Sequence, residues 1–164
     1  MAEKNVLNRI ISKLNALPES VRGHAISAVI GRTVRYAGTS NIYIEKLTTT
    51  ESIMRLKNKK KVQNHIGSIH AAAMGLLAES ATGLLVGMNV PDNAVPVIKT
   101  LHVDYEKRCK GDIKAVARLT KEQIEQITTT EKGEVSVDIT VTDETGNEHI
   151  SCEMIWAWVP KVRK

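Results

Sequence analysis

The sequence predicts an α+β fold in which one long central helix is wrapped by a curved antiparallel sheet of about six strands, after two N-terminal helices. Residues 67–88 are apolar on every side, which is typical of a helix buried in a core. After Pro91 the pattern changes to an alternation with period two, the signature of half-buried strands. Because a helix that is apolar all round needs a surface around it, we expect a strongly twisted sheet to enclose it.

Length and composition fit a single globular domain with a modest excess of positive charge. The chain has 164 residues, of which 42% are hydrophobic and 25% charged, far from the composition of disordered chains. The net charge of +5 suits an anionic ligand, and a polyphosphate satisfies it as well as a nucleic acid does. We predict one domain over residues 1–164, with a helical extension over residues 1–34 and a core over residues 41–160.

The N-terminal extension is predicted to form two helices. Apolar residues recur at helical spacing from Val6 to Leu17, polar residues fill the other face, and Pro18 ends this helix. Pro18 and Glu19 resemble the first turn of a second helix, whose apolar residues continue toward Gly31. The chain therefore opens as a helical pair.

The β-prone runs follow the order strand, strand, helix and then four strands. The first two lie around residues 42–44 and 53–56, and the turn between them predicts a hairpin. The later runs predict four long antiparallel strands at residues 97–105, 113–119, 135–141 and 150–158. One helical turn is expected around Glu122–Ile127. Since a sheet around one helix leaves an edge strand unpaired, we predict edge-to-edge dimerisation.

The apolar segment is long enough to suggest a membrane span, but Glu79 places a carboxylate near its centre. Four glycines also interrupt it, so a buried core helix is the better interpretation and we predict no membrane partner. These glycines, at positions 67, 75, 83 and 87, fall on one ridge of a helix. We expect another backbone or a sheet close against that ridge.

The run from Asn64 to Glu79 reads Asn-His-Ile-Gly-Ser-Ile-His-Ala-Ala-Ala-Met-Gly-Leu-Leu-Ala-Glu. It resembles the hotdog-fold acyl-CoA thioesterases, specifically the PaaI-like branch with the pattern Asn-x-x-Gly-x-x-His-Gly-Gly-x-x-x-x-Leu-Ala-Asp/Glu. The positions in register are Asn64, Gly67, His70, Leu77, Ala78 and Glu79. Residues 103–117 also resemble the strand pair that follows the helix in this family. The resemblance implies a hotdog fold over about residues 41–160 and hydrolysis of an acyl-CoA thioester.

The sequence departs from that pattern at Ala71 and Ala72, where the catalytic branch commonly has two glycines. Alanines at these positions and an N-terminal helical extension are closest to a hotdog branch of uncharacterised activity. For that branch the resemblance implies the fold more firmly than the reaction, because one fold hosts many functions. A non-catalytic hotdog protein that binds an acyl thioester or a fatty acyl group therefore stays open as the alternative.

Four residues of this run are candidate catalytic residues. At the start of the helix the free N–H of Ala71 points outward from the positive end of the helix dipole, where it would stabilise an oxyanion. The amide of Asn64, just before the helix, can hold a carbonyl or a water. Glu79 lies alone among apolar residues, so burial should raise its pKa and suit it as a general base or nucleophile, although a structural role stays open. His70 is either a base or, more simply, a residue that orients the loop.

Ala71 and Glu79 are eight residues apart, roughly 12 Å along a helix, which is more than a glutamate side chain can reach. They therefore cannot serve one site within one subunit. The resemblance implies that the helix start of one subunit pairs with the carboxylate of its partner across a twofold axis. It thus implies a homodimer, or a dimer of dimers, with two composite sites per dimer.

Two basic clusters are candidates for binding the phosphates of coenzyme A. The first comprises Lys59, Lys60 and Lys61, after Arg55 and Lys57, and the second comprises Lys107, Arg108 and Lys110. Gly67 completes the expected substrate-binding residues. Point charges attract phosphates without a defined motif, although such runs are often only solvated turns. Neither cluster is interleaved with aromatic residues, so we predict no nucleic-acid partner.

The other chemistry-bearing residues favour no further reaction class. His65 stands fourteen residues before Glu79, which resembles the hotdog dehydratases, but the proline-rich turn of those enzymes is missing. Cys109 and Cys152 lack CxxC spacing, so we expect reduced thiols, no metal site and no cofactor besides the coenzyme A thioester substrate. The N-terminal residues lack the apolar run of a signal peptide, and we expect a cytoplasmic protein. Composition decides neither the acyl chain nor the choice between coenzyme A and an acyl-carrier protein.

Overall fold

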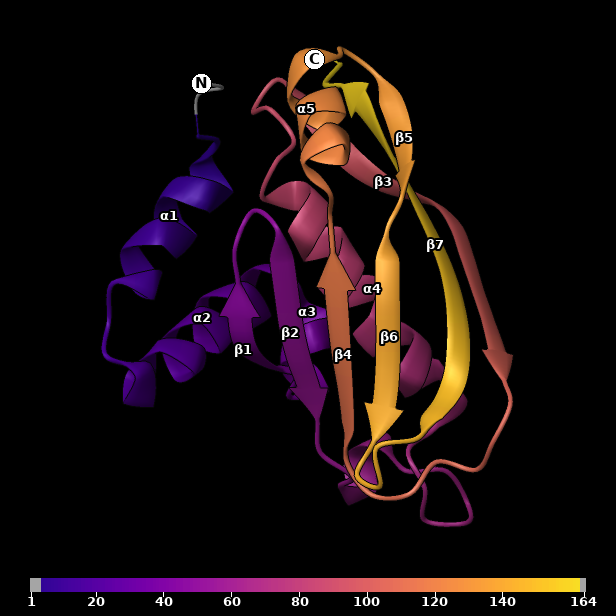
Figure 1. Ribbon diagram of the computed structural model, residues 1–164. Coiled ribbons are helices and arrows are strands. Elements are labelled where there is room, and N and C mark those ends of the chain that lie inside the picture. Colours follow the sequence, from indigo (N-terminus) through magenta and orange to yellow (C-terminus); the bar gives the residue numbers. More distant parts are fainter. Residues whose placement is uncertain (1–3, 163–164) are drawn as a thin grey trace.

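The computed structural model describes residues 4–162 and has the α+β architecture that the sequence predicts (Figure 1). The helices are α1 (Val6–Asn15), α2 (Glu19–Thr33), α3 (Arg35–Thr39), α4 (Ala71–Gly87) and α5 (Lys121–Thr129), with a 3₁₀ turn at Lys60–Val62. The strands are β1 (Tyr43–Leu47), β2 (Glu51–Leu56), β3 (Ala94–Tyr105), β4 (Ile113–Arg118), β5 (Gly133–Ser136), β6 (Asp138–Asp143) and β7 (Glu148–Pro160). They form one antiparallel sheet in the order β1-β2-β4-β6-β7-β3, with β5 also paired to β7.

Helix α4 is the central helix around which the sheet curves (Figure 1). It packs against β2, β3 and β4, and Leu77, Ala78 and Leu85 have no exposed surface. The core is mainly aliphatic, and Trp158 is its largest fully buried side chain. A helix that is apolar on all sides is thus stabilised by burial rather than by its own polar face, as the sequence predicts.

The N-terminal extension is tied to the core at two places. Asn5 caps α1, and its side-chain amide donates to the carbonyl oxygens of Gly87 and Val90 at 2.7 and 2.6 Å. Helix α2 packs along β1, where the Ser27 hydroxyl accepts a hydrogen bond from the Ile44 N–H at 2.8 Å. The short helix α3 was not predicted from the sequence. The first three residues of the predicted extension over 1–34 lie outside the described residues.

Helix α4 begins at Ala71, later than the predicted start near Gly67. Gly67 has a φ of +77°, a left-handed conformation that glycine adopts without strain, and its N–H donates to the Asn64 carbonyl at 3.2 Å. It therefore lies in a turn and not on the predicted glycine ridge. Gly83 does face a close neighbour, because a Cβ there would lie 2.5 Å from the Trp156 ring.

The strand β3 is an edge strand and is mostly exposed, so the prediction that its alternating side chains are half-buried is wrong for the single chain. Val97, Leu101 and Tyr105 are 42%, 49% and 52% exposed. The ladder between β3 and β7 shifts register between Ile98 and Thr100, which makes Lys99 the extra residue of a bulge. This bulge explains why Lys99 interrupts the apolar alternation.

The sheet has seven strands rather than about six, because the predicted strand at residues 135–141 is divided at Val137. Its first part, β5, pairs only with β7, whereas its second part, β6, pairs with both β4 and β7. The N–H of Val137 still donates to the Met154 carbonyl at 3.0 Å. The alternation of buried Val135, Val137 and Val141 therefore continues across the division.

Candidate active site

The loop before α4 is shaped by Asn64 and sets the start of the helix. The side-chain oxygen of Asn64 accepts hydrogen bonds from the N–H groups of Ile66 and Ser68, both at 3.1 Å. The N–H of His70 donates to the Val62 carbonyl at 2.7 Å, which fixes the last residue before the helix. Because the Asn64 oxygen is engaged in the loop, its NH₂ group is the part of the side chain that can donate to a carbonyl or a water.

His70 is the N-cap of α4, and its capping bonds leave one helix N–H unused. Its Nδ1 accepts from the Ala72 N–H at 3.0 Å, and its carbonyl oxygen accepts from the N–H groups of Ala73 and Met74. Within residues 4–162, the N–H of Ala71 has no hydrogen-bond acceptor, and Ala71 is exposed. The geometry favours an orienting role for His70 and leaves Ala71 to present a donor at the positive end of α4.

Tyr105 reaches the same helix start from the end of β3. Its hydroxyl donates to the Ala71 carbonyl at 2.8 Å, and its ring is 52% exposed. The hydroxyl oxygen keeps lone pairs with which it can accept a hydrogen bond from a ligand. Sequence reasoning missed this residue, whose one signal was its place at the end of an alternating strand.

Glu79 lies about two turns further along α4, in surroundings that weaken its acidity. Burial raises the pKa of the Glu79 carboxyl, and a long contact with the Ser80 hydroxyl, at 3.5 Å, opposes the shift only weakly. No ion pair of the described residues involves this carboxylate. The isolated environment predicted from the sequence is therefore present, and a carboxyl with a raised pKa suits proton transfer near neutral pH.

An apolar hollow of about 220 Å³ opens beside Glu79, and we call it the α4 hollow. Its walls include Leu7 from α1, Leu84 and Gly87 from α4, Pro96 from β3 and Trp156 from β7. Among residues 4–162, Glu79 is the only charged side chain that lines it. Sequence reasoning did not place Leu7 or Trp156 near Glu79. The one sequence feature that pointed to close packing here was the glycine spacing of α4.

A second hollow, of about 480 Å³, lies between α2 and the β1–β2 hairpin, and we call it the basic cleft. The cations that line it are Arg55, Lys57, Lys59 and Lys61. Glu45, the one carboxylate that lines it in the described part of the chain, is paired with Arg55 and with Lys114. The structure thus gathers Lys59 and Lys61 from the first predicted cluster, whereas Lys60 does not line the cleft.

The second predicted cluster lies elsewhere, in the exposed loop between β3 and β4. The backbone N–H of Lys107 donates to the His149 carbonyl, and that of Lys110 donates to the Asp143 carboxylate at 3.1 Å. Neither these lysines nor Arg108 lines the basic cleft. The two basic clusters therefore do not form one surface.

Helix α4 keeps Ala71 and Glu79 apart within one chain. Both residues belong to one uninterrupted helix, in which eight positions span roughly 12 Å. The fold brings His70 and Tyr105 to the helix start at Ala71, holds Asn64 in the loop before it, and places Glu79 on the α4 hollow instead. Two half-sites therefore lie on the same helix, one with hydrogen-bond donors and one with a carboxylate.

The other candidate groups do not join either half-site. His65 is exposed in the loop before the helix. Burial raises the pKa of both the Cys109 and Cys152 thiols to about 11, so each is a poor nucleophile at neutral pH. In the described residues no group of three or more His, Cys, Asp or Glu side chains is arranged to hold a metal ion. No helix within residues 4–162 has both the length and the apolar character needed to cross a membrane.

Comparison with known proteins agrees with this architecture. The family model for a domain of unknown function, DUF4442, matches residues 22–159, which include the helix start, Glu79 and all of the sheet except the last residue of β7. No curated protein matches the chain significantly.

Several solved structures share the fold. A Pseudomonas aeruginosa protein described as a probable thioesterase superposes with a TM-score of 0.74 at 26% identity, covering 88% of this chain and 97% of its own. A mutant thioesterase from Pseudomonas aeruginosa gives 0.67 at 15% identity, with 82% and 94% covered. A thioesterase from Haemophilus influenzae gives 0.64 at 11% identity, with 78% and 85% covered. These similarities confirm that the chain has the hotdog fold.

Proposed function

Because the chain belongs to the DUF4442 family and has the hotdog fold of solved thioesterases, we propose that it hydrolyses an acyl-CoA-type thioester at a composite site across a homodimer. One observation carries the proposal. Helix α4 presents a free N–H at Ala71 and a partly buried, unpaired carboxylate at Glu79. These are the two groups that acyl transfer to water requires, a donor for the oxyanion and a base or nucleophile.

The proposed reaction divides the work between two copies of α4. The Ala71 N–H of one subunit donates to the thioester carbonyl oxygen, and the Asn64 amide orients the same carbonyl or the attacking water. The partner subunit's Glu79 takes a proton from that water as it attacks the carbonyl carbon. The C–S bond then breaks, the thiolate receives a proton, and the products are a carboxylic acid and a thiol. Direct attack by the carboxylate, with a later hydrolysis step, uses the same residues.

The exposed edge strand supports the dimer. The apolar side chains of Val97 and Leu101 on β3 are largely exposed, and an edge strand offers unpaired backbone groups to a second copy. Pairing of two β3 strands about a twofold axis would extend the sheet and bring the two α4 helices together. Further association into a dimer of dimers would use other faces.

The α4 hollow supports a place for the acyl group. Its lining is apolar apart from Glu79 and Ser80, and its volume is about 220 Å³. A cavity of about 150 Å³ holds a benzene ring, so this space suits a short aliphatic or an aromatic acyl group better than a long chain. We therefore expect turnover to fall as the acyl chain lengthens.

One observation favours a second function, the binding of an acyl thioester without turnover. Ala71 and Ala72 are both exposed at the helix start, where their methyl groups stand beside the proposed oxyanion donor. The methyl group of Ala71 can hold the carbonyl group of the thioester away from the Ala71 N–H. Saturable binding without hydrolysis, for every acyl group tested, would identify this function.

Release of free thiol from acyl-CoA substrates tests the proposal. Wild type, Glu79→Gln and the matched control Glu125→Gln, an exposed glutamate of α5, are compared on short, medium, long and aromatic acyl groups. We expect the wild type and the control to turn over and the Glu79 variant to lose at least about 100-fold in kcat, with all three dimeric or larger by light scattering. Equal activity of the two variants, or a monomeric wild type, would contradict the proposal.

A further inference from the structure

We propose that the basic cleft and the groove next to it form one site for a nucleotide that carries several phosphate groups, and that this nucleotide is the end of coenzyme A remote from the thiol. The identity of the source rests on the proposed function, whereas the nucleotide chemistry rests on the site itself. This assignment selects coenzyme A over a carrier protein as the thiol of the substrate.

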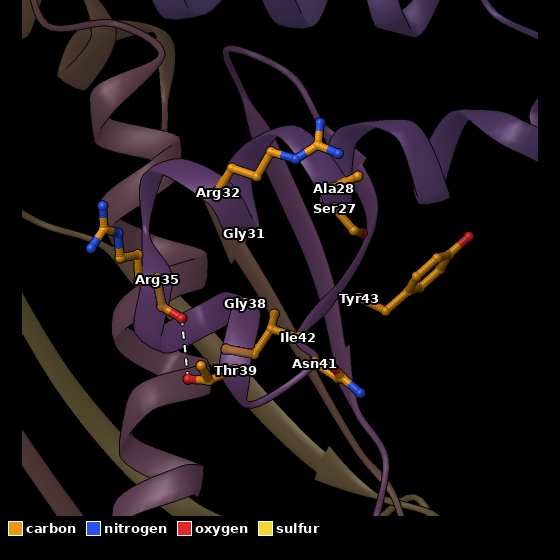
Figure 2. A pocket seen from close by; sticks show the side chains of 10 residues that line it. All are labelled: Ser27, Ala28, Gly31, Arg32, Arg35, Gly38, Thr39, Asn41, Ile42 and Tyr43. Atoms are coloured by element: carbon orange, nitrogen blue, oxygen red, sulfur yellow. Dashed lines mark hydrogen bonds between the residues drawn. The ribbon is translucent and has the colours of Figure 1, made fainter.

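The groove, of about 610 Å³, lies between the end of α2, α3 and the start of β1, and we call it the α2–α3 groove (Figure 2). Asn41 and Tyr43 line both this groove and the basic cleft, so the two hollows are adjacent. In Figure 2 the side chain of Arg32 extends toward Ser27 and that of Arg35 points to the left, away from Asn41 and Tyr43 at the right. A ligand with two separate polar ends therefore has room along the N-terminal extension, with one end in each hollow.

A close helix crossing forms the floor of this groove. A Cβ at Gly31 would lie 3.0 Å from the Cα of Gly38, and a Cβ at Gly38 would overlap the Gly31 carbonyl. Asn41, which follows α3, has a φ of +57°, a left-handed conformation uncommon outside glycine. The chain thus holds α2, α3 and the turn into β1 close together, and the hollow remains beside them.

The charges around the two adjacent hollows are almost all positive. Glu45, their one carboxylate, is already paired with Arg55 and Lys114. The other lining cations, with no carboxylate partner among residues 4–162, are Arg32, Arg35, Lys57, Lys59 and Lys61. Only Lys61 is engaged, as its ammonium donates to the Thr39 carbonyl at 2.6 Å. Several cations without counter-charges around a concave surface attract a ligand with several phosphates.

One wall of the basic cleft offers contacts for an uncharged ring. The rings of Tyr43 and His24 lie 5.1 Å apart, centre to centre, in an edge-to-face arrangement, and both residues line the basic cleft. Ser40 and Asn41 add a hydroxyl and an amide to the same wall. An aromatic face next to polar side chains is the surface on which a nucleotide base stacks and forms hydrogen bonds.

The basic cleft lies within reach of the proposed oxyanion donor. Lys61 precedes Val62, whose carbonyl accepts the His70 N–H, and His70 precedes Ala71. From strand-pair geometry the Cα atoms of Lys61 and Ala71 lie no more than about 13 Å apart. The flexible arm of a coenzyme A whose phosphates occupy the cleft can therefore bring the thioester to the helix start of the same subunit.

Calorimetric binding to the intact protein tests the site without any need for turnover. The probes are coenzyme A, adenosine 3′,5′-bisphosphate, ADP and pantetheine, which lacks both the nucleotide and the phosphates. We expect coenzyme A and the bisphosphate to bind and pantetheine not to bind measurably. Binding of pantetheine as tight as that of coenzyme A would overturn the site, and binding of ADP tighter than that of coenzyme A would overturn coenzyme A as its source.

Charge reversal locates the site. Lys57→Glu with Lys59→Glu should weaken coenzyme A binding by roughly tenfold or more, whereas Lys121→Glu with Lys132→Glu, an equal charge change at exposed residues outside both hollows, should cost much less. The cleft variant should also raise KM for acyl-CoA far more than it raises KM for the same acyl group on N-acetylcysteamine, which lacks the nucleotide. Equal losses in both double variants would overturn the location. A protein that binds nucleotides but hydrolyses no thioester would contradict the proposed function and leave the nucleotide site standing.

Discussion

The Nδ1 atom of His70 accepts a hydrogen bond from the N–H of Ala72 at 3.0 Å, and this contact defines how α4 begins. The His70 side chain thus accepts from the second N–H of the helix. The His70 carbonyl accepts from the third and fourth, those of Ala73 and Met74. The N–H of Ala71 is the one left for a ligand. In the proposed site His70 would therefore be a positioning residue that acts through the helix start.

Replacing Ala71 with proline removes that single N–H. Proline is favoured at the first position of a helix, and His70 already has the extended backbone, with φ −64° and ψ 142°, that a residue before proline needs. We expect Ala71→Pro to fold normally and to lose about 100-fold or more in kcat, as loss of an oxyanion donor does. Ala71→Gly keeps the N–H and is the matched control. Equal activity of the proline and glycine variants would exclude the oxyanion role.

Mixing two inactive variants tests whether the site is shared between subunits. Each Ala71→Pro/Glu79→Gln heterodimer would contain one site with both defects and one site with neither. If subunits exchange at random, about a quarter of the wild-type activity should return when the two proteins are refolded together in equal amounts. No recovery, despite heterodimers detected by mass spectrometry, would contradict a composite site.

Glu79→Gln should stabilise the protein while it removes activity. Burial raises the folded-state pKa of Glu79 above its ordinary 4.5, so the folded chain holds this proton more tightly than the unfolded chain does. Stability is therefore lost as the pH rises from 4.5 through the raised pKa, and glutamine avoids this loss. We expect a gain of no more than about 1 kcal/mol at neutral pH, because solvent screens a partly exposed group. Urea unfolding should show a gain near pH 7 that shrinks toward pH 4; a gain independent of pH would point to another cause.

A lysine at Val97 should break the proposed dimer. Val97 is 42% exposed on the β3 edge, and Val21, on α2, is a matched control at 48%. Burial of an ammonium group at a twofold interface costs about 2 kcal/mol or more, roughly thirtyfold in the dissociation constant. Val97→Lys should shift light-scattering mass toward the monomer and lower activity in parallel, whereas Val21→Lys should do neither. A dimer that withstands Val97→Lys would place the interface elsewhere.

Two identical substitutions in α4 should have opposite effects on stability. A Cβ at Gly75 meets no atom within 4 Å, whereas a Cβ at Gly83 would lie 2.5 Å from the Trp156 ring. Alanine is favoured over glycine in a helix by up to about 1 kcal/mol, so Gly75→Ala should gain roughly that much. Gly83→Ala should lose about 1–3 kcal/mol, because the indole is also held by its hydrogen bond to the Thr82 hydroxyl at 2.9 Å. Thermal unfolding of both variants would show which variant is more stable. Equal shifts in Tm would contradict the prediction.

His149 should make stability depend on pH in the mildly acidic range. Its side chain is fully buried, and neither ring nitrogen has a hydrogen-bond partner among the described residues. Burial lowers the pKa of His149 below its ordinary 6.5, with the nearby Asn147 backbone and the Asp143 carboxylate opposing the shift. Below that pH the unfolded chain binds the proton more readily, so stability falls as the pH drops from 6.5 toward the lowered pKa.

Unfolding by urea at a series of pH values measures this effect. His149→Leu should lose part of the decline in unfolding free energy below pH 6.5, whereas the matched control His65→Gln, at an exposed loop residue, should keep it. An unchanged slope in His149→Leu would assign the acid sensitivity to other groups.

Periodicity located the elements well and their ends less well. The apolar run identified α4, but it placed the start near Gly67 because Ser68 and Ile69 are buried although they precede the helix. Apolar spacing reports which residues are buried, and a buried loop gives the same signal as a helix. The true start carries a histidine cap, which is not among the residues that usually mark an N-cap.

The exposure of β3 shows a different limit. Its alternation of apolar and polar residues predicted a half-buried strand, yet Leu101 is 49% exposed in the single chain. Alternation of apolar and polar residues indicates that one face of a strand is buried. It does not identify the segment or partner chain that buries this face. The proposed dimer supplies that cover, which no pattern within one chain can specify.

By itself the sequence determined the buried helix, its solitary Glu79 and the register from Asn64 to Glu79, because helical and strand periodicities are local properties of the chain. Only the tertiary structure decided that Leu7 and Trp156 share a hollow with Glu79, and that Lys59 and Lys61 face a cleft that Lys60 does not. Those relations depend on which strands pair and on which side chains fit, as Trp156 fits over Gly83. They arise from packing between segments far apart in the chain, on which local spacing carries no information.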